Sequence, residues 1–447
     1  MLKRYCYTML FNLCVPWLLL HLLWRSRRLS AYRQRLEERF GYVARRDTAQ
    51  LCIGLHAVSV GEIMAAKPLI KALLRETVAQ VWVTTTTPTG SAMLEQWFKN
   101  EMHNGRVLHS YLPYDLPDGI GRFLRRVQPC LWLVMETGIW PNWYRACAKR
   151  RIPLLLVNAR LSAKSLRGYQ RLGGVIHKTL ADVSTLVARS AADADAFQQL
   201  GMNPARILVG GNVKFDLSVP DGLAAQAQHL RQAWGDAPVW VAGSTHEGEE
   251  KQILVVYQRL RQILPNLKLV VVPRHPQRFA DVFALCQQWA TLYEWQVARR
   301  SESATLPKTT DIILGDTLGE LLMWYALADV AFIGGSLVEH GGHNPLEAAV
   351  WGVPMVTGRY TDNFADMFPD LCRSGGAIRV DGMVQLQQAL LMWLQDDDAR
   401  HYAGQQARRF VLMHQGATAT IMQCVHNYLA HRSPSAATTF HDPAIAY

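Results

Sequence analysis

Short apolar runs alternate with longer stretches of helical spacing along most of this chain. The runs cover residues 51–58, 81–85, 131–135, 154–157 and 186–188 in the first half, and 239–242, 267–272, 312–314, 330–333 and 355–356 in the second. Repeated strand–helix units of this kind predict parallel sheets with helices on both faces. The predicted fold class is therefore α/β, with two doubly wound, Rossmann-like domains. Such domains bind ligands at the carboxyl ends of their strands, and we expect the two to face each other across a cleft.

The pattern pauses at residues 210–223, a Gly- and Pro-containing stretch that is typical of a linker between domains. The sequence thus predicts a first domain over residues 51–215 and a second over residues 216–432. Residues 433–447 lack the pattern and are expected to form a loose tail.

An apolar run of a different kind precedes the first domain. Residues 5–24 are apolar over about 20 positions, roughly the length of helix that crosses the hydrocarbon core of a bilayer. A signal peptide and a buried core helix are the alternatives, but arginines follow this run where a signal peptide would have a cleavage site of small residues. We expect residues 1–26 to form a membrane anchor. The positive-inside rule then places the body of the protein in the cytoplasm.

Positive charge is concentrated beside this run. The chain of 447 residues has a formal charge of +11, and residues 1–50 hold 10 Lys or Arg against 3 Asp or Glu. This asymmetry favours contact with an anionic surface near the N-terminus over a nucleic-acid groove along the whole protein. Residues 27–50 are predicted to form a basic amphipathic segment at the membrane surface, with Tyr32, Leu36 and Phe40 on one helical face.

Composition indicates a folded protein with reduced thiols. Hydrophobic residues make up 49% of the chain, enough for a sizeable core. The eight cysteines are scattered, without a C-x-x-C pair or a zinc-like spacing, which is typical of reduced thiols in the cytosol.

The glycine-rich stretch after residues 330–333 is a candidate anion site. The pattern predicts a helix that opens at Asn344 with Pro345 in its first position. A strand, a glycine loop and a helix N-terminus can hold a phosphate, because free N–H groups and the helix dipole point into the loop. Asn344 and Glu347 also have the spacing of a capping box, as do Ser244 with Glu247 and Thr317 with Glu320. Anion binding and simple capping are both open at this point.

The predicted strand ends carry a distinctive set of short motifs. In order along the chain they are HAVSVGE, TTTTPTG, METGIWPN, NARLS, GNVKFD, GSTHEGEE, PRHPQRF, GDTLGE and GGHNPLEA. This set closely resembles the Kdo transferases of lipopolysaccharide synthesis, which are 3-deoxy-D-manno-octulosonic acid transferases with the GT-B glycosyltransferase fold. The resemblance extends from the N-terminal anchor to beyond Gly358. It is specific, because many GT-B enzymes share N-P-x-E but not the combination of HAVSVGE with METGIWPN.

The resemblance implies an inverting, metal-independent transfer of Kdo from CMP-Kdo to a lipid A precursor (lipid IVA), with no cofactor. Such a transfer needs a base for the acceptor hydroxyl and stabilisation of the departing phosphate. The base of the family falls on Glu62, which we expect to be ionised at neutral pH. The alternative is an ordinary acid in a first helical turn. Glu136 and Lys214 fall on positions thought to assist the transition state, although Lys214 could equally be a solvated linker lysine.

The donor-binding positions that the resemblance implies lie in the second half of the chain. They are Ser244, Thr245, Arg274, His275, Gly315, Asp316, Thr317, Gly341, Gly342, His343, Asn344 and Glu347. Glu347 would accept hydrogen bonds from the ribose hydroxyls. The implied partners are CMP-Kdo, the lipid A precursor and the cytoplasmic membrane, with no nucleic acid.

Other chemistries lack their signatures. The sequence contains no P-loop, no G-x-G-x-x-G and no H-E-x-x-H. His340 and His343 lack a third ligand nearby and are interpreted as loop histidines, and Asp193 with Asp195 as a solvated helix face. Two alternatives are another GT-B enzyme that uses a UDP-sugar, either a transferase or an epimerase, and a non-catalytic, membrane-attached nucleotide-binding protein.

Overall fold

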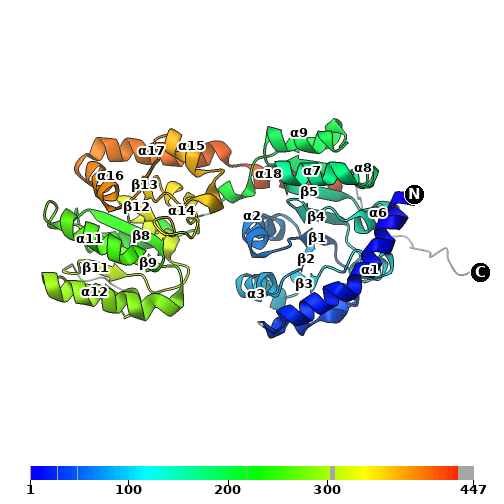
Figure 1. Cartoon of the computed structure of the whole chain (residues 1–447), viewed down its shortest axis with the longest axis horizontal. Helices are drawn as coiled ribbons and strands as arrows, with labels where there is room; N and C mark the ends of the chain where they lie inside the picture. Colours follow the sequence, from blue (N-terminus) through cyan, green and yellow to red (C-terminus); the bar gives the residue numbers. More distant parts are fainter. Residues whose placement is uncertain (1, 28, 48, 218, 303–307, 431–447) are drawn as a thin grey trace, which may run out of the picture. The chain divides into compact units, whose positions relative to one another are not determined.

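The structure is a computed structural model that describes residues 2–27, 29–47, 49–217, 219–302 and 308–430. The chain divides into two compact units, Met1–Asp216 with Gln415–Tyr447, and Leu217–His414 (Figure 1). Arg28 and the expected tail at 433–447 lie outside the described residues.

The first unit is built on a seven-stranded parallel sheet in the order β3-β2-β1-β4-β5-β6-β7. Its strands are β1 (Cys52–His56), β2 (Gln80–Thr85), β3 (Val107–Tyr111), β4 (Leu131–Met135), β5 (Leu154–Ala159), β6 (Thr185–Ala188) and β7 (Ile207–Val209). Its helices are α1 (Leu2–Arg25), α2 (Val60–Glu76), α3 (Pro88–Trp97), α4 (Lys99–His103), α5 (Pro117–Val127), α6 (Pro141–Lys149), α7 (Ala163–Leu172), α8 (Gly174–Ala181), α9 (Ala191–Gln199) and α18 (Ala417–Ala430), with 3-10 turns η1 (Ser30–Arg33), η2 (Leu36–Phe40), η3 (Pro204–Arg206) and η4 (Val213–Phe215).

Both faces of this sheet are covered, because successive side chains of a strand point to opposite faces. Leu131 and Leu133 of β4 pack with α2, α3 and α18 in one core cluster. Trp132 and Val134 pack with α5, α6, α8 and α9 in the other. Strand β4 is therefore apolar at every position, which is why its sequence is a continuous hydrophobic run.

The second unit repeats the plan with the sheet order β10-β11-β9-β8-β12-β13-β14, again all parallel. Its strands are β8 (Val239–Thr245), β9 (Lys268–Pro273), β10 (Val297–Arg299), β11 (Ile312–Leu314), β12 (Val330–Ile333), β13 (Met355–Thr357) and β14 (Ala377–Arg379). Its helices are α10 (Leu223–Gln232), α11 (Glu249–Arg261), α12 (Phe279–Tyr293), α13 (Leu321–Ala326), α14 (Leu346–Ala349), α15 (Phe368–Arg373), α16 (Met383–Gln395) and α17 (Asp397–His414), with 3-10 turns η5 (Pro276–Arg278), η6 (Arg300–Glu302) and η7 (Asp362–Phe364). Two doubly wound parallel-sheet units match the predicted GT-B architecture.

The C-terminal helix α18 differs from the prediction that residues 216–432 form one domain. It belongs to the first unit, where it packs on α2 and η4. Ile421 and Val425 are fully buried among side chains of α2 and the sheet. The apolar face of α18 thus completes the cover of the first sheet, a long-range contact that local pattern does not reveal.

Helix α1 lies along the first unit and contacts η1, α6 and α8. Arg4 pairs with Asp182 at 3.2 Å, Tyr7 donates to the buried Asp115 at 3.0 Å, and Thr8 donates to Asn142 at 3.1 Å. The outward side is apolar and exposed, with exposed fractions of 75% for Leu13, 64% for Trp17 and 65% for Leu20. Among the described helices, α1 is the one whose length and composition would allow it to cross a membrane.

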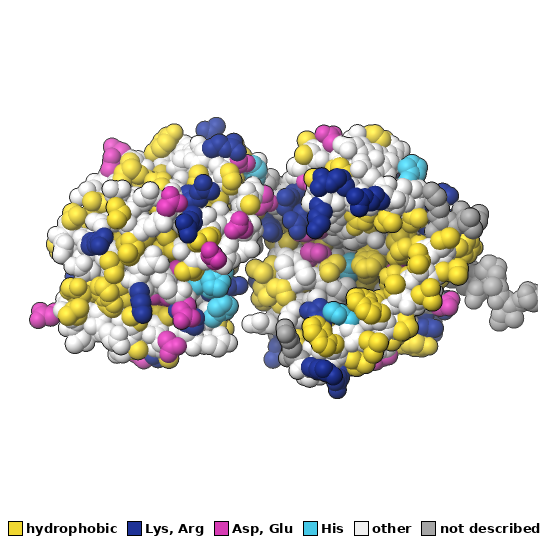
Figure 2. Space-filling model, in the orientation of Figure 1, with side chains coloured by type: hydrophobic (Ala, Val, Ile, Leu, Met, Phe, Trp, Pro, Cys, Tyr) yellow, Lys and Arg dark blue, Asp and Glu magenta, His cyan; other side chains and the backbone are white. Residues whose placement is uncertain are grey.

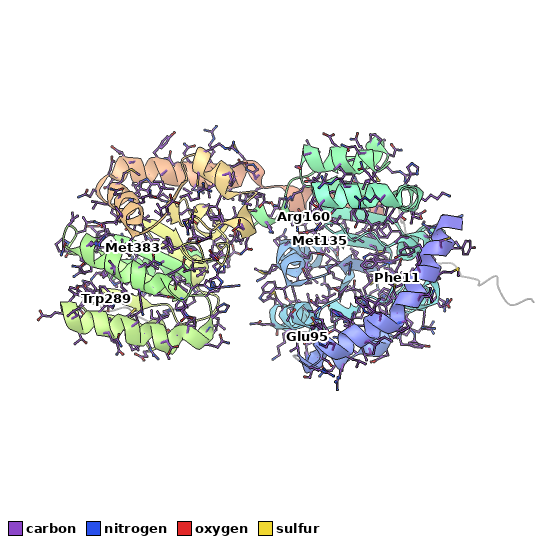
Figure 3. The ribbon with its side chains drawn as sticks, viewed as in Figure 1. Phe11, Glu95, Met135, Arg160, Trp289 and Met383 are labelled. Atoms are coloured by element: carbon purple, nitrogen blue, oxygen red, sulfur yellow. The ribbon has the colours of Figure 1, made fainter. Side chains whose placement is uncertain are left out.

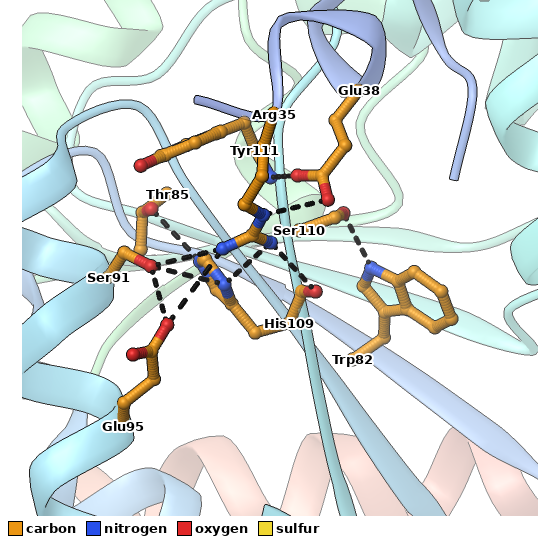
Figure 4. Close-up of polar contacts among 9 residues, drawn as sticks. All are labelled: Arg35, Glu38, Trp82, Thr85, Ser91, Glu95, His109, Ser110 and Tyr111. Atoms are coloured by element: carbon orange, nitrogen blue, oxygen red, sulfur yellow. Dashed lines mark hydrogen bonds and ion pairs between the residues drawn. The ribbon is translucent and has the colours of Figure 1, made fainter. Parts of the chain in front are cut away.

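The segment at 27–50 does not form the amphipathic helix that the sequence predicts. It forms the short turns η1 and η2, and several of its arginines bind the first unit instead of facing outward. Arg35 donates to Glu38 at 2.8 Å, to Ser91 at 3.3 Å and to the backbone oxygen of His109 at 3.2 Å (Figure 4). Arg39 is 5% exposed and donates to the backbone oxygen of Thr86.

Arg46 is likewise buried, and it donates to the backbone oxygens of Val127, Asp47 and Gln50. The prediction failed because charge content alone cannot distinguish an arginine that faces an anionic surface from one that satisfies buried carbonyl oxygens.

Candidate functional site

Glu62 lies in the first turn of α2, directly after the end of β1. Its Oε2 atom accepts a hydrogen bond from the backbone N–H of Val58 at 2.8 Å, which fixes the side chain at the edge where the strands end. The pKa of Glu62 is raised to about 7: burial is the largest cause and the negative charge of Glu136 adds to it, while the Val58 hydrogen bond and Arg160 lower it. Glu62 is therefore only partly ionised at pH 7, and not fully ionised as the sequence analysis expected, because the carboxyl is largely removed from solvent.

Glu136 follows β4, and its partner is an arginine to which the sequence analysis assigned no role. Arg160, which follows β5, donates from Nε to Oε2 of Glu136 at 2.8 Å. Figure 3 shows Arg160 at the end of the sheet in this unit. The structure thus brings Glu62, Glu136 and Arg160 together at one edge, since adjacent parallel strands end there.

Backbone strain is concentrated at the same edge. Glu136 has φ 54° and Asn158 has φ 51°, in the left-handed region that disfavours side-chain-bearing residues. Such conformations cost on the order of 1–3 kcal/mol and persist where surrounding contacts impose them. Glu136 follows β4 and Asn158 lies near the end of the adjacent strand β5, so both strained residues lie at the carboxyl edge of the sheet, where ligands bind in folds of this kind.

Lys214 is half-buried in η4, which packs against α2. The side-chain oxygen of the buried Asn158 accepts the backbone N–H of Val213 at 3.2 Å, and that of Asn212 accepts the N–H of Lys214 at 3.1 Å. Lys214 is therefore held on an ordered turn beside the helix that carries Glu62, and it is not a loose linker lysine.

The second unit contains a cluster of histidines at the ends of its central strands. The Nε2 atoms of His246 and His343 lie 2.7 Å apart, and the His246 ring stacks on His340 with ring centroids 4.1 Å apart. His275 meets His246 edge-on at 5.3 Å. The pKa of His246 is lowered to about 4 and that of His343 to about 3, mainly by burial, with contributions from neighbouring imidazoles and, for His343, from Arg274. Both rings are therefore neutral at pH 7 and can donate or accept hydrogen bonds.

Glu249 organises the loop that joins this cluster. Its fully buried carboxylate accepts backbone N–H groups from His246, Gly335, Ser336 and Leu337, at 2.7–2.9 Å. The N–H groups of the glycine loop at 335–337 are therefore already bound to a carboxylate of the protein. This part of the predicted anion site is therefore not available to a ligand.

The remaining loop also differs from the predicted helix start. Helix α14 begins at Leu346, two residues after Asn344, and spans only four residues. Asn344 accepts the N–H of Leu346 at 3.2 Å and donates to Glu347 at 3.3 Å. Gly341 and Gly342 have positive φ values, and a side chain at Gly341 would meet Asn363 at 2.8 Å.

The predicted capping pair of Ser244 with Glu247 does not form. Ser244 still lies within β8, buried and with φ 56°, and Gly248 precedes α11. The backbone oxygen of Thr245 accepts the N–H of Arg274 at 3.0 Å, which joins the ends of β8 and β9. The side chain of Arg274 is exposed, and its charge contributes to the low pKa of His343.

Three predicted donor residues lie at the end of the neighbouring strand β11. Gly315 packs closely against Trp324: a Cβ atom at position 315 would lie only 2.9 Å from Nε1 of Trp324. Asp316 accepts from the backbone N–H and hydroxyl of Ser301 at 2.8 and 2.6 Å, and Thr317 donates to Glu320. These contacts direct Asp316 and Thr317 toward the 300–302 turn and not toward the histidines.

Four residues of the site were not assigned by sequence reasoning: Arg160, His246, Glu249 and His340. The first three lie within motifs NARLS and GSTHEGEE, so the motifs marked the right loops without indicating which side chains meet. Among the residues that the structure describes, no group of three or more His, Cys, Asp or Glu side chains is arranged to hold a metal ion.

The chain is similar to known proteins over most of its length. A family described as 3-Deoxy-D-manno-octulosonic-acid transferase (kdotransferase) matches residues 34–217. A 3-deoxy-D-manno-octulosonic acid transferase of Haemophilus influenzae is 36% identical over 430 residues, covering 95% of this chain and 99% of that protein. The chain belongs to the Kdo transferase family. The corresponding protein of Bordetella pertussis is also 36% identical, over 91% of this chain and 95% of its own.

A solved structure of more distant sequence shows the same fold. It is a UDP-GlcNAc 2-epimerase from Neisseria meningitidis bound to UDP-GlcNAc, 12% identical, with a TM-score of 0.55, covering 84% of this chain and all of that one. This Kdo transferase is therefore a glycosyltransferase with the GT-B fold, and lipopolysaccharide synthesis is the role of its family.

Proposed function

We propose that this Kdo transferase moves Kdo from CMP-Kdo to a lipid A precursor, with inversion at the anomeric carbon and without a metal ion. The observation that carries the proposal is Glu62, a fixed carboxyl group with a pKa of about 7 at the edge of the first sheet. A general base works best when its pKa lies near the operating pH. Glu62 has this property and stands beside a strained, ion-paired Glu136.

In the proposed reaction, ionised Glu62 takes the proton of the acceptor hydroxyl. The hydroxyl oxygen attacks the anomeric carbon of Kdo on the face opposite CMP, the bond to the phosphate oxygen breaks, and CMP leaves with the electron pair. One direct displacement inverts the configuration. Lys214, held beside α2, would offset the carboxylate charge of Kdo.

The second unit would bind the donor. Arg274 supplies an exposed cation beside the histidine cluster, and a guanidinium can bind a phosphate through two parallel hydrogen bonds. Because Glu249 occupies the N–H groups at 335–337, the proposal assigns charge neutralisation of the phosphate to Arg274 and hydrogen-bond donation to the neutral imidazoles. Glu347 would accept the ribose hydroxyls.

We further propose that α1 attaches the enzyme to the cytoplasmic face of the inner membrane. Its exposed apolar side supports this, as does the acylated nature of the acceptor. The acceptor would then be reached at the membrane surface, without leaving the bilayer.

The experiment is to incubate the purified protein with CMP-Kdo and lipid IVA, in buffer with and without EDTA, and to measure the product mass and anomeric configuration. Addition of Kdo, release of CMP, inverted configuration and insensitivity to EDTA are the expected results. Turnover of UDP-sugars alone would favour another GT-B activity, and CMP binding without turnover would favour a binding protein. Loss of activity that Mg²⁺ restores would contradict the metal-independent mechanism.

A further inference from the structure

A long part of the first unit carries only positive charge. Between Glu136 and Asp182 the chain has nine Lys or Arg residues and no Asp or Glu. Three of these cations, Lys164, Arg167 and Arg171, belong to α7, where the spacing of three and four residues places them on one side of the helix. We call these three residues the basic stripe.

The packing of α7 leaves the basic stripe in solvent. Leu166 and Tyr169 are partly buried against the core, whereas all three cations are exposed. Figure 2 shows Lys and Arg side chains gathered over α7. Within the described part of the chain, no ion pair within 4.0 Å involves a residue of the stripe, in contrast to Arg35 with Glu38 or Arg145 with Asp182. Like charges at this spacing destabilise a helix slightly, so the stripe does not serve the fold.

The basic stripe lies between two functional features of the same unit. Helix α7 begins three residues after Arg160, whose guanidinium contacts Glu136 next to Glu62. Helix α7 packs on α8, and α8 in turn contacts the apolar helix α1 (Figure 1). The contacts of α7 and α8 thus connect α1 with the strand end that carries Arg160.

We propose that Lys164, Arg167 and Arg171 bind the phosphate groups of the glycolipid acceptor while its acyl chains remain in the bilayer beside α1. The proposal rests on the function proposed above. The stripe spans seven residues of helix, or about 10 Å, which matches charges carried on a short oligosaccharide rather than a single ion. Guanidinium groups suit phosphate because they donate paired hydrogen bonds, and no acidic side chain on α7 competes with the ligand.

The proposal can be tested with a triple variant, Lys164→Gln, Arg167→Gln and Arg171→Gln. Kinetics would be measured in neutral detergent micelles with the phosphorylated lipid acceptor and with the same lipid after removal of its phosphates. We expect KM for the phosphorylated acceptor to rise on the order of tenfold or more, because charge-assisted hydrogen bonds are lost. KM for the dephosphorylated acceptor, kcat and CMP affinity should match those of the parent.

A matched control removes three exposed cations elsewhere in the unit, with Lys71→Gln, Lys99→Gln and Arg125→Gln. Its KM for both acceptors should equal that of the parent, and thermal unfolding of both triple variants should show that α7 still folds. An unchanged KM for the phosphorylated acceptor in the stripe variant would overturn the proposal. So would a loss confined to binding of anionic phospholipid vesicles, which would assign the stripe to the membrane surface. Absence of transfer by the parent itself would overturn the proposed function, a result distinct from transfer with an unchanged KM.

Discussion

The guanidinium of Arg160 donates to the carboxylate of Glu136 across 2.8 Å, from the end of one central strand to the end of the next. This pair lies close enough to Glu62 to influence its titration. Burial is the largest cause that raises the pKa of Glu62, and the negative charge of Glu136 adds to it, whereas the Val58 hydrogen bond and the positive charge of Arg160 lower it. The sum of these effects is a pKa of about 7, and Arg160 offsets part of the contribution of Glu136.

Removing Arg160 should therefore change the pH dependence of catalysis. For the parent, kcat/KM should rise about tenfold per pH unit below pH 7 and level off above it, because only ionised Glu62 accepts a proton. In Arg160→Gln, the uncompensated charge of Glu136 should raise the pKa of Glu62, and the midpoint should move to higher pH. Arg145→Gln, which removes a more distant ion pair with Asp182, should leave the midpoint unchanged. Identical profiles for the two variants would contradict this coupling.

Glu249 should prove essential for the donor half of the site. Glu249→Ala would leave four backbone N–H groups without their acceptor in a buried loop, at a cost on the order of 3–5 kcal/mol in unfolding free energy. Calorimetry should show weaker CMP binding, because the loop that carries His343 loses its support. Glu247→Ala, an exposed neighbour, is the control and should change neither property. A stable Glu249→Ala variant with normal CMP affinity would show that the loop is held by other contacts.

The outward side of α1 should account for membrane binding. Replacing Leu13, Trp17 and Leu20 with serine removes exposed apolar surface, so sedimentation with lipid vesicles should fall while thermal stability stays near that of the parent. Replacing Tyr7 with Phe instead removes the hydrogen bond to buried Asp115 and should lower stability by about 1 kcal/mol without reducing sedimentation. Equal sedimentation of the serine variant and the parent would argue against α1 as the anchor.

The central strands of both sheets could be predicted from the sequence, whereas the strands that the pattern missed all lie at the edges of a sheet. They are β3, β7, β10 and β14, the edge strands of the two sheets. An edge strand has less of its surface covered and needs no continuous apolar run: β10 is partly exposed at every position, and β7 exposes Leu208 and Val209. A continuous apolar run is required only of a strand that is buried on both faces, so the hydrophobic pattern detects central strands and misses edge strands.

The sequence motifs showed which loops form the site, but they did not predict the contacts and pKa values of its side chains. The position of Glu62 followed from the VSVGE motif, whereas its pKa depends on burial and on Arg160, which is distant in sequence. The N–H groups of the glycine loop bind Glu249, a contact between residues 86–88 positions apart. Local spacing suggested instead that Ser244 and Glu247 form a capping box, although Ser244 still belongs to β8 and α11 begins only after Gly248.

The most direct test of the account is the turnover of Glu62→Gln with CMP-Kdo and lipid IVA, measured at saturating substrate at pH 8. Glutamine keeps the size of the side chain and can still accept the Val58 hydrogen bond, but it cannot take up the proton of the acceptor hydroxyl. The account predicts a fall in kcat on the order of 10²–10⁴-fold with CMP affinity unchanged. A Glu62→Gln variant that folds normally and keeps a kcat close to that of the parent would show that Glu62 is not the base.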